Sequence, residues 1–272
     1  MKGLLEQNES PAEIVRGEVF QRYSAYYDLL YADKDYTAEV DYVVSRLRAA
    51  DPDISTLLEF GSGTGRHGRL LAARGFDVFG IERSETMAAE AQRSSAPGAL
   101  PLPGRFECMH GDIRTATAHR TVDAVVSLFH VISYQTGNDD LIQTFSNARA
   151  HLRDGGLFLF DVWHGPAVLS DRPAVRVKRV EDHQMRLTRV AEPSIDFNRN
   201  IVTVAYTIFA EAKANGTMTT FRETHPMRFL FPTEIQLLAS QIGFDIEATE
   251  EFATGQPASE RTWGVCYVLR KR

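Results

Sequence analysis

A glycine-rich segment holds the residues best suited to bind a ligand. Leu57–Gly68 reads LLEFGSGTGRHG, with glycine at the alternate positions 61, 63 and 65. The segment follows a short apolar run and precedes a helical pattern, a context in which glycines let a ligand approach the backbone. A dinucleotide fingerprint that starts at Gly61 would require a glycine where this chain has Arg66. The negative charge of Glu59 favours a cationic ligand over a pyrophosphate, so the segment indicates a site for a cationic small molecule and disfavours a nicotinamide oxidoreductase.

Two further acids end the next apolar runs. Glu82 lies about 20 residues beyond the first glycines, where an acid can accept hydrogen bonds from both hydroxyls of a ribose. Asp112 follows Gly111 at the end of the third run, where it could accept a hydrogen bond from an exocyclic amine. Either acid alone could be a solvated loop residue. Their order after Glu59 makes them candidates for one nucleoside site.

Two histidines are candidates for proton transfer. His130 follows the fourth apolar run, and His164 follows the fifth. The carboxyl ends of parallel strands face the ligand crevice of such a sheet, and an imidazole placed there can act as a general base. The alternative, a neutral histidine that orders a loop by hydrogen bonding, stays open for both.

The surrounding pattern predicts an α/β fold that is interrupted once. Apolar strands alternate with helical segments through the first part of the chain, which indicates a doubly wound parallel sheet. From about Pro173 to Phe231, strand follows strand with turns at 198–200 and 215–216, which indicates an antiparallel insert. A helix at 233–242, with a capping box from Thr233 to Gln236, and two strands complete the chain. We therefore expect three parts. Residues 1–14 form a flexible lead-in, and residues 15–172 and 232–272 form the α/β domain. Residues 173–231 form an antiparallel β insert that serves as acceptor lid or dimer contact.

Composition excludes several other functions. The net charge is −6, so a basic surface for nucleic acid is not expected. Cys108 and Cys266 lie far apart, and we predict neither a disulfide framework nor a metal site. No apolar run approaches the roughly 20 residues that cross a bilayer. We expect a cytoplasmic protein without a membrane partner.

Together, the glycine turn, the three acids and Asp154–Leu157 resemble the ordered motifs of class I S-adenosylmethionine-dependent methyltransferases. This resemblance implies a doubly wound seven-stranded sheet whose last strands form an antiparallel hairpin, with S-adenosylmethionine as the cofactor. It also implies that Glu59, Gly61 and Gly63 flank the methionine part of the cofactor, Glu82 its ribose, and Asp112 its adenine. The other residues expected around the cofactor are Tyr23, Tyr36, Arg83, Met87, Ile113 and Leu128.

The N-terminal segments Tyr27–Tyr31 and Lys34–Tyr36, together with the insert, resemble nucleotide-linked aminosugar N-methyltransferases. This resemblance implies methylation of the amine of a small-molecule acceptor, and a homodimer. Tyr31 then joins His130 and His164 as a catalytic candidate. The residues expected to contact the acceptor are Tyr27, Tyr134, Trp163, Arg176 and His225.

One residue departs from the pattern of the aminosugar enzymes. His130 stands where a small residue is expected. O-methylation of a sugar or secondary-metabolite hydroxyl, with His130 or His164 as general base, therefore stays open. A scaffold of the same fold without activity is the least favoured alternative, because it would have no need for all three acids.

Overall fold

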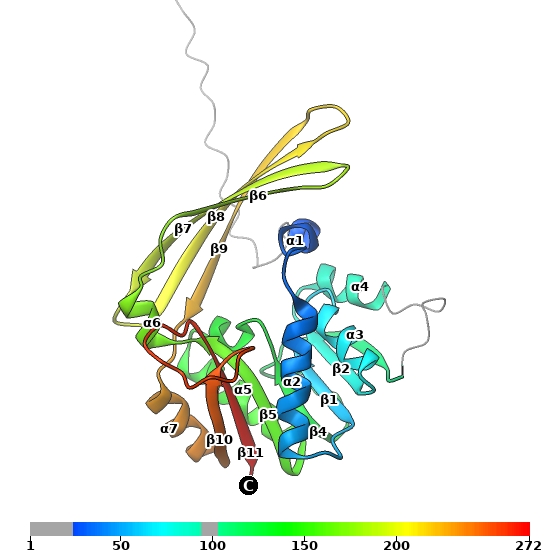
Figure 1. Cartoon of the computed structure of the whole chain (residues 1–272), viewed down its shortest axis with the longest axis vertical. Coiled ribbons are helices and arrows are strands. Elements are labelled where there is room, and N and C mark those ends of the chain that lie inside the picture. The colour runs from blue at the N-terminus through cyan, green and yellow to red at the C-terminus, as the bar shows by residue number, and fades with distance from the viewer. Residues whose placement is uncertain (1–23, 94–102) are drawn as a thin grey trace, which may run out of the picture.

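The computed structural model describes residues 24–93 and 103–272 (Figure 1). The expected lead-in and Tyr23 lie outside the described residues. Within the described part of the chain there are two β-sheets, a seven-stranded main sheet and a four-stranded second sheet.

The main sheet has the strand order β10-β11-β5-β4-β1-β2-β3. All neighbouring pairs run parallel except those of β11, which is antiparallel to both β5 and β10. This order and the antiparallel last hairpin confirm the predicted fold class. The strands are β1 (Thr56–Phe60), β2 (Asp77–Glu82), β3 (Phe106–His110), β4 (Val122–Ser127), β5 (Leu152–Trp163), β10 (Phe244–Glu251) and β11 (Gly264–Lys271).

Helices cover both faces of the main sheet, because alternate residues of each strand point to opposite faces. On one face, Leu57 packs with apolar residues of α2 (Tyr36–Ala50), α3 (Arg66–Ala73) and α4 (Glu85–Arg93). On the other face, Leu58 packs with α5 (Asn138–His151) and α7 (Pro232–Ile242). Burial on both sides explains why these strands read as almost continuous apolar runs.

The second sheet extends from the end of the main sheet at which the parallel strands terminate (Figure 1). Its strands run antiparallel in chain order and all lie within the segment 173–231 that the sequence sets apart. A short helix, α6 (Gly165–Ser170), leads into it from β5. The strands are β6 (Arg176–Glu181), β7 (Met185–Asp196), β8 (Ile201–Ala212) and β9 (Met218–Arg228).

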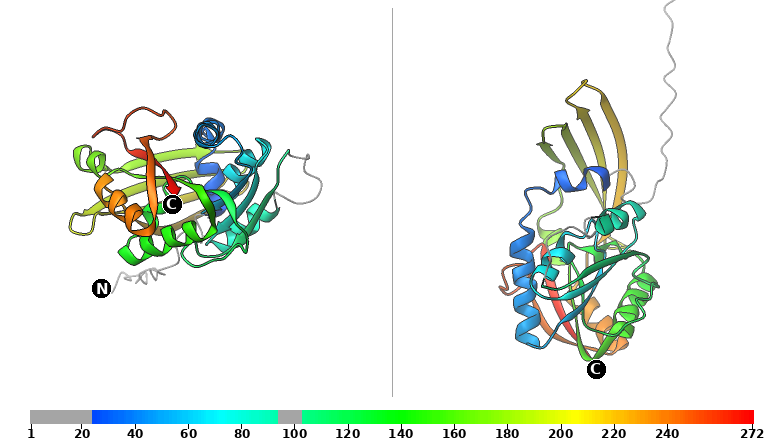
Figure 2. Two further views of the ribbon diagram at one scale, coloured as in Figure 1. Left: turned by 90° about the horizontal axis from the view of Figure 1, so that it is seen from below. Right: turned by 90° about the vertical axis from the view of Figure 1, so that its right-hand side faces the viewer.

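The short helix α1 (Ser24–Leu30) lies between the two sheets, as Figure 2 shows in its right-hand view. Leu30 is fully buried among Leu187, Ile208 and Phe221 of the second sheet. From the same helix, Asp28 accepts a hydrogen bond of 3.0 Å from Thr64 Oγ1 in the glycine-rich loop. Helix α1 therefore joins the second sheet to the first loop of the main sheet.

One local prediction was wrong. Helix α7 is capped at Phe231, whose N–H donates to Glu234 Oε2 at 2.9 Å, because Pro232 begins the helix before Thr233. Gly155, with φ of 71°, lies inside β5, since the strand starts at Leu152. His151, the last residue of α5, is buried and accepts a hydrogen bond from the Ala118 N–H.

Candidate active site

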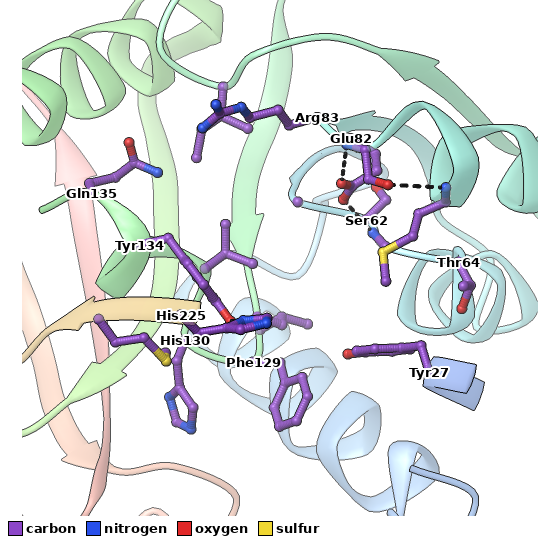
Figure 3. A pocket seen from close by; sticks show the side chains of 18 of the residues that line it. Tyr27, Ser62, Thr64, Glu82, Arg83, Phe129, His130, Tyr134, Gln135 and His225 are labelled. Carbon is purple, nitrogen blue, oxygen red and sulfur yellow. Dashed lines mark hydrogen bonds between the residues drawn. The ribbon is translucent and has the colours of Figure 1, made fainter. Parts of the chain in front are cut away.

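A cavity of about 560 Å³ lies between the carboxyl edge of the main sheet, helix α1 and the second sheet. Figure 3 shows it from close by, with Glu82 and Thr64 on one side and Tyr134 and His225 on the other. It brings together most of the residues that the sequence singles out. Those that line it are Tyr27, Tyr31, Tyr36, Gly61, Gly63, Glu82, Arg83, Met87, Asp112, Ile113, Leu128, His130, Tyr134, Trp163 and His225.

The glycine-rich loop forms the floor of one half of the cavity. Gly61 and Gly63 have φ values of 75° and 57°, in the left-handed region that favours glycine. A Cβ at Gly61 would stand 2.6 Å from the side chain of Val131, so this position admits no side chain without a shift. A Cβ at Gly63 would meet nothing within 4 Å in the described structure. The backbone at Gly63 is therefore open to a ligand in the cavity.

Glu82 ties this loop to the end of β2. Its Oε2 accepts a 2.8 Å hydrogen bond from the Gly63 N–H, and its Oε1 accepts a 2.7 Å bond from the Ser84 N–H (Figure 3). Burial raises the pKa of Glu82, and the backbone hydrogen bonds partly oppose this shift by stabilising the carboxylate. Each oxygen keeps a further lone pair, so the carboxylate can also accept hydrogen bonds from a ligand.

Glu59 differs from the expectation that it contacts the ligand directly. Its side chain is buried on the α3 face of the sheet, beneath the loop, and a Cβ on Gly68 of α3 would stand 2.7 Å from its Oε2. No group in the described residues donates a hydrogen bond to that oxygen. Burial raises the pKa of Glu59 to about 7, and the nearby Glu82 adds to the rise. Glu59 therefore lies under the cavity and is not among the residues that line it.

At the end of β3, Asp112 is paired with a residue that the sequence did not single out for this role. The guanidinium of Arg114 donates to Asp112 Oδ2 from Nη2 at 2.6 Å and to Oδ1 from Nε at 3.0 Å. Its Nη1 lies 2.5 Å from Asp140 Oδ1 at the start of α5. The hydrogen bonds from Arg114 lower the pKa of Asp112. The buried side chains of Met87 and Ile113 add apolar surface to this part of the cavity.

Aromatic rings from the N-terminal region close the cavity opposite the glycine-rich loop. The rings of Tyr27 and Tyr31 have centroids 4.7 Å apart, and Phe129 meets Tyr31 edge-on at 5.1 Å. Tyr36 lies 4.9 Å from the ring of His67. Burial raises the pKa of Tyr36 to about 12, so its hydroxyl stays protonated. The Lys34 ammonium already lies 4.7 Å from the centroid of the Tyr36 ring and 4.4 Å from that of Phe129, so these rings contact a cation of the protein itself.

Strand β4 is followed, after Leu128, by two consecutive residues with left-handed backbone conformation. Phe129 has φ of 65° and His130 has φ of 62°, which costs energy for non-glycine residues and often marks a functional site. The His130 N–H donates to both carboxylate oxygens of Asp161, at 3.1 and 3.2 Å. The His130 Nδ1 lies 2.6 Å from Asp161 Oδ2, and Asp161 is fully buried in β5. A buried carboxylate thus orients an imidazole that remains 23% exposed at the cavity.

The other half of the cavity is formed by the 3₁₀-helix η1 (Val131–Tyr134) and the second sheet. Tyr134 Oη lies 3.0 Å from Nδ1 of His225, which is only 1% exposed. Tyr206 of β8 and Met227 of β9 also line this half. The sequence reasoning missed them, although the two-residue period of β9 places Met227 on the same face as His225.

Two other predicted site residues lie elsewhere. His164 is buried as the N-cap residue of α6, where burial lowers its pKa. Arg176 is exposed on β6, which forms an edge of the second sheet. The structure therefore does not bring either side chain to the cavity, and an acceptor base at His164 has no structural support.

The chain resembles known methyltransferases in sequence and in structure. A family model described as a methyltransferase domain matches residues 57–156. A dTDP-3-amino-3,4,6-trideoxy-alpha-D-glucopyranose N,N-dimethyltransferase from Streptomyces venezuelae is 25% identical over 232 residues, which cover 85% of this chain and 93% of that protein. A dTDP-3-amino-3,6-dideoxy-alpha-D-glucopyranose N,N-dimethyltransferase from Streptomyces fradiae is 26% identical, over 85% of this chain and 86% of that protein. Among solved structures, the sugar N-methyltransferase KedS8 from Streptoalloteichus sp. has a TM-score of 0.76 at 22% identity, over the whole of both chains, which shows a shared fold.

The matched domain supports an S-adenosylmethionine-dependent methyltransferase, and the chain shares the fold of a solved enzyme of that kind. The geometry of the cavity is compatible with the binding of S-adenosylmethionine. Open space lies over Gly63, and the Glu82 carboxylate faces that space with lone pairs to spare. The two Streptomyces proteins and KedS8 are named as sugar N-methyltransferases. Among the helices of residues 24–93 and 103–272, none combines the length and the apolar character that a membrane span requires.

Proposed function

We propose that the protein transfers a methyl group from S-adenosylmethionine to the amine of a nucleotide-linked aminosugar. The names of the relatives that span most of the chain support this acceptor class. The cavity supports it independently, because it continues from the glycine-rich loop to a half lined by polar and aromatic side chains of η1 and the second sheet. This continuity is the observation that carries the proposal, since donor and acceptor must meet in one space.

The cofactor half would hold the nucleoside. In this proposal the ribose hydroxyls donate to Glu82, the adenine lies between Met87 and Ile113 with Asp112 near its amine, and Tyr36, Arg83 and Leu128 complete the surroundings. The loop at Gly61 and Gly63 takes the methionine part. S-adenosylmethionine supplies a methyl group already activated by a positively charged sulfur.

The acceptor half would align the amine with that methyl group. The segment 173–231 then acts as an acceptor lid, with His225 and Met227 facing the sugar, while Tyr27, Tyr31 and Trp163 border the same space. Alignment of two reactants contributes roughly 7–11 kcal/mol in favourable systems. An ammonium group must lose a proton before it can attack, and burial in the cavity favours the neutral amine.

The experiment is methyl transfer from labelled S-adenosylmethionine to a dTDP-linked 3-amino-dideoxyhexose, followed by mass spectrometry of the sugar. We expect the labelled methyl group in the aminosugar product, with the corresponding gain in mass, and none in the matching 3-hydroxy sugar. Transfer to the hydroxy sugar, with none to the amine, would refute the proposed acceptor.

The His130–Asp161 pair favours a second candidate, O-methylation of a sugar or secondary-metabolite hydroxyl. A hydroxyl has a much higher pKa than an ammonium group and generally needs a positioned base, for which an imidazole fixed by a buried carboxylate is suited. Replacing His130 with Asn, which tolerates left-handed backbone, separates the two candidates. A loss of turnover of about 10²-fold or more supports O-methylation, whereas near-normal turnover supports the amine.

Two further expectations stay predictions. A homodimer and a cytoplasmic location follow from the resemblance and the composition alone. Sedimentation of the purified chain and fractionation of cells that produce it would test them.

A further inference from the structure

A second cluster of titratable groups lies in the acceptor half, apart from the His130–Asp161 pair. Tyr134 comes from η1, whereas His225 and Glu223 come from β9 of the second sheet. Tyr134 Oη lies 3.0 Å from His225 Nδ1, and His225 Nε2 lies 3.5 Å from Glu223 Oε2. The side chains of His225 and Glu223 are 1% and 9% exposed. The three groups therefore form a chain that leads from the cavity into the second sheet.

We infer that Tyr134, His225 and Glu223 form a proton relay that accepts the proton of the acceptor's ammonium group. This role rests on the proposed N-methylation and assigns the second sheet a part in the chemistry as well as in enclosing the acceptor. Tyr134 and His225 both line the cavity, and Figure 3 shows their side chains meeting there. Glu223 acts through His225 and is a positioning residue.

The direction of the hydrogen bond follows from the charges around the imidazole. The carboxylate of Glu223 favours a proton on Nε2 of His225, which leaves the Nδ1 lone pair facing Tyr134. Burial raises the pKa of Tyr134 well above its ordinary value, so the phenol keeps its proton. Tyr134 therefore donates its O–H to Nδ1, and in this proposal its Oη accepts from an N–H of the substrate in the cavity that it lines.

The transfer balances in one concerted step. The ammonium N–H bond breaks and leaves its electron pair on nitrogen, Tyr134 Oη takes that proton, and the original phenolic proton passes to Nδ1. The amine is then neutral and nucleophilic, Tyr134 is again a phenol, and His225 is an imidazolium beside the carboxylate of Glu223. After the product leaves, the proton returns through Tyr134 to water that enters the cavity.

The groups that surround the imidazole of His225 come from several elements. The ring of Tyr206 in β8 stands edge-on to the imidazole at 4.9 Å. Arg189 of β7 lies over the Tyr206 ring at 4.9 Å and donates to Tyr31 Oη at 3.1 Å. The titratable and charged groups around the relay are Tyr31, Tyr134, Arg189, Tyr206 and Glu223.

The kinetic test compares Tyr134→Phe and His225→Asn with the wild type across pH 6–9, with a dTDP-linked aminosugar as acceptor. We expect kcat at pH 7 to fall about 10²-fold in both variants, and the rise of kcat with pH to move to higher pH. The affinity for S-adenosylhomocysteine should stay unchanged. Tyr42→Phe removes a buried hydroxyl that contacts Glu250, away from the cavity, and serves as the matched control. A higher KM with an unchanged pH profile in both variants would overturn the relay.

A second measurement does not depend on turnover. Nitrogen-15 NMR of His225, in the full chain with S-adenosylhomocysteine bound, should show protonated Nε2 and unprotonated Nδ1, and Glu223→Gln should weaken this preference. A tautomer with the proton on Nδ1 would overturn the relay even if aminosugars are methylated. If no aminosugar is methylated but the Nε2–H tautomer is found, the proposed acceptor fails while the relay geometry is upheld.

Discussion

At the scale of single residues, Glu59 and Glu82 show that similar positions in the sequence need not mean similar roles. Both acids stand at strand ends, and both were expected to touch the ligand. Because side chains alternate along β1, with Leu58 on the α5 face, Glu59 points to the α3 face and is buried there. Glu82 lines the cavity and holds the Gly63 N–H. A motif gives the order of such acids but not the side of the sheet on which each one lies.

The buried Glu59 carboxyl makes stability depend on pH. Its pKa is about 7 in the folded chain, compared with an ordinary value of 4.5, because burial disfavours the charge. Below pH 4.5 the carboxyl is protonated in both states. As pH rises from 4.5 to 7, the unfolded chain releases the proton first, so the contribution to folding stability falls by up to about 3 kcal/mol.

Replacing Glu59 with Gln removes this titration. We expect the variant to gain stability relative to the wild type as pH rises from 4.5 to 8, measured by urea unfolding at each pH. Below pH 4.5 the difference between the two proteins should stop changing. A difference that stays constant from pH 4.5 to 8 would contradict the raised pKa.

At the scale of elements, the sequence predicted the main strands and helices well because their apolar patterns match their burial on both faces. It misplaced boundaries where one side chain decides them, as at α7, which starts at Pro232 with Glu234 holding the Phe231 N–H. It also could not show that Arg114 pairs with both Asp112 and Asp140, since α5 and the end of β3 meet only in the folded chain.

A testable prediction about a single element concerns the position of helix α1. A helix of seven residues is not stable alone, so its position depends on its contacts. Asp28 accepts from Thr64 Oγ1 and lies 3.1 Å from Arg66 Nε, which links the helix to the glycine-rich loop. We expect Asp28→Ala to weaken binding of S-adenosylhomocysteine about two- to five-fold. The effect should be small because the ion pair between Asp28 and Arg66 is partly exposed to solvent.

Isothermal calorimetry measures this effect directly. Asp28→Asn keeps an acceptor for Thr64 but loses the charge, so its affinity should fall between those of the wild type and the alanine variant. Equal affinities in all three proteins would show that α1 is held by its apolar contacts alone.

At the scale of the whole molecule, the cavity depends on two sheets that no local pattern places relative to each other. The sequence predicted an α/β body and an antiparallel insert, and it named His225 and Tyr134 as acceptor residues. It did not identify Tyr206 and Met227, because a residue on a two-residue period can face either side of an insert whose position is unknown. The half of the cavity built from ordered motifs was therefore easier to predict than the half built from the second sheet.

The central claim is that one cavity holds the cofactor beside Glu82 and directs its sulfur toward the half formed by η1 and the second sheet. A crystal structure of the full chain with S-adenosylhomocysteine tests it most directly. We expect the ribose hydroxyls within hydrogen-bond distance of Glu82, the adenine between Met87 and Ile113, and the sulfur on the side of Tyr134 and His225. A nucleoside bound outside this cavity, or a glycine-rich loop closed by its own side chains, would contradict the claim.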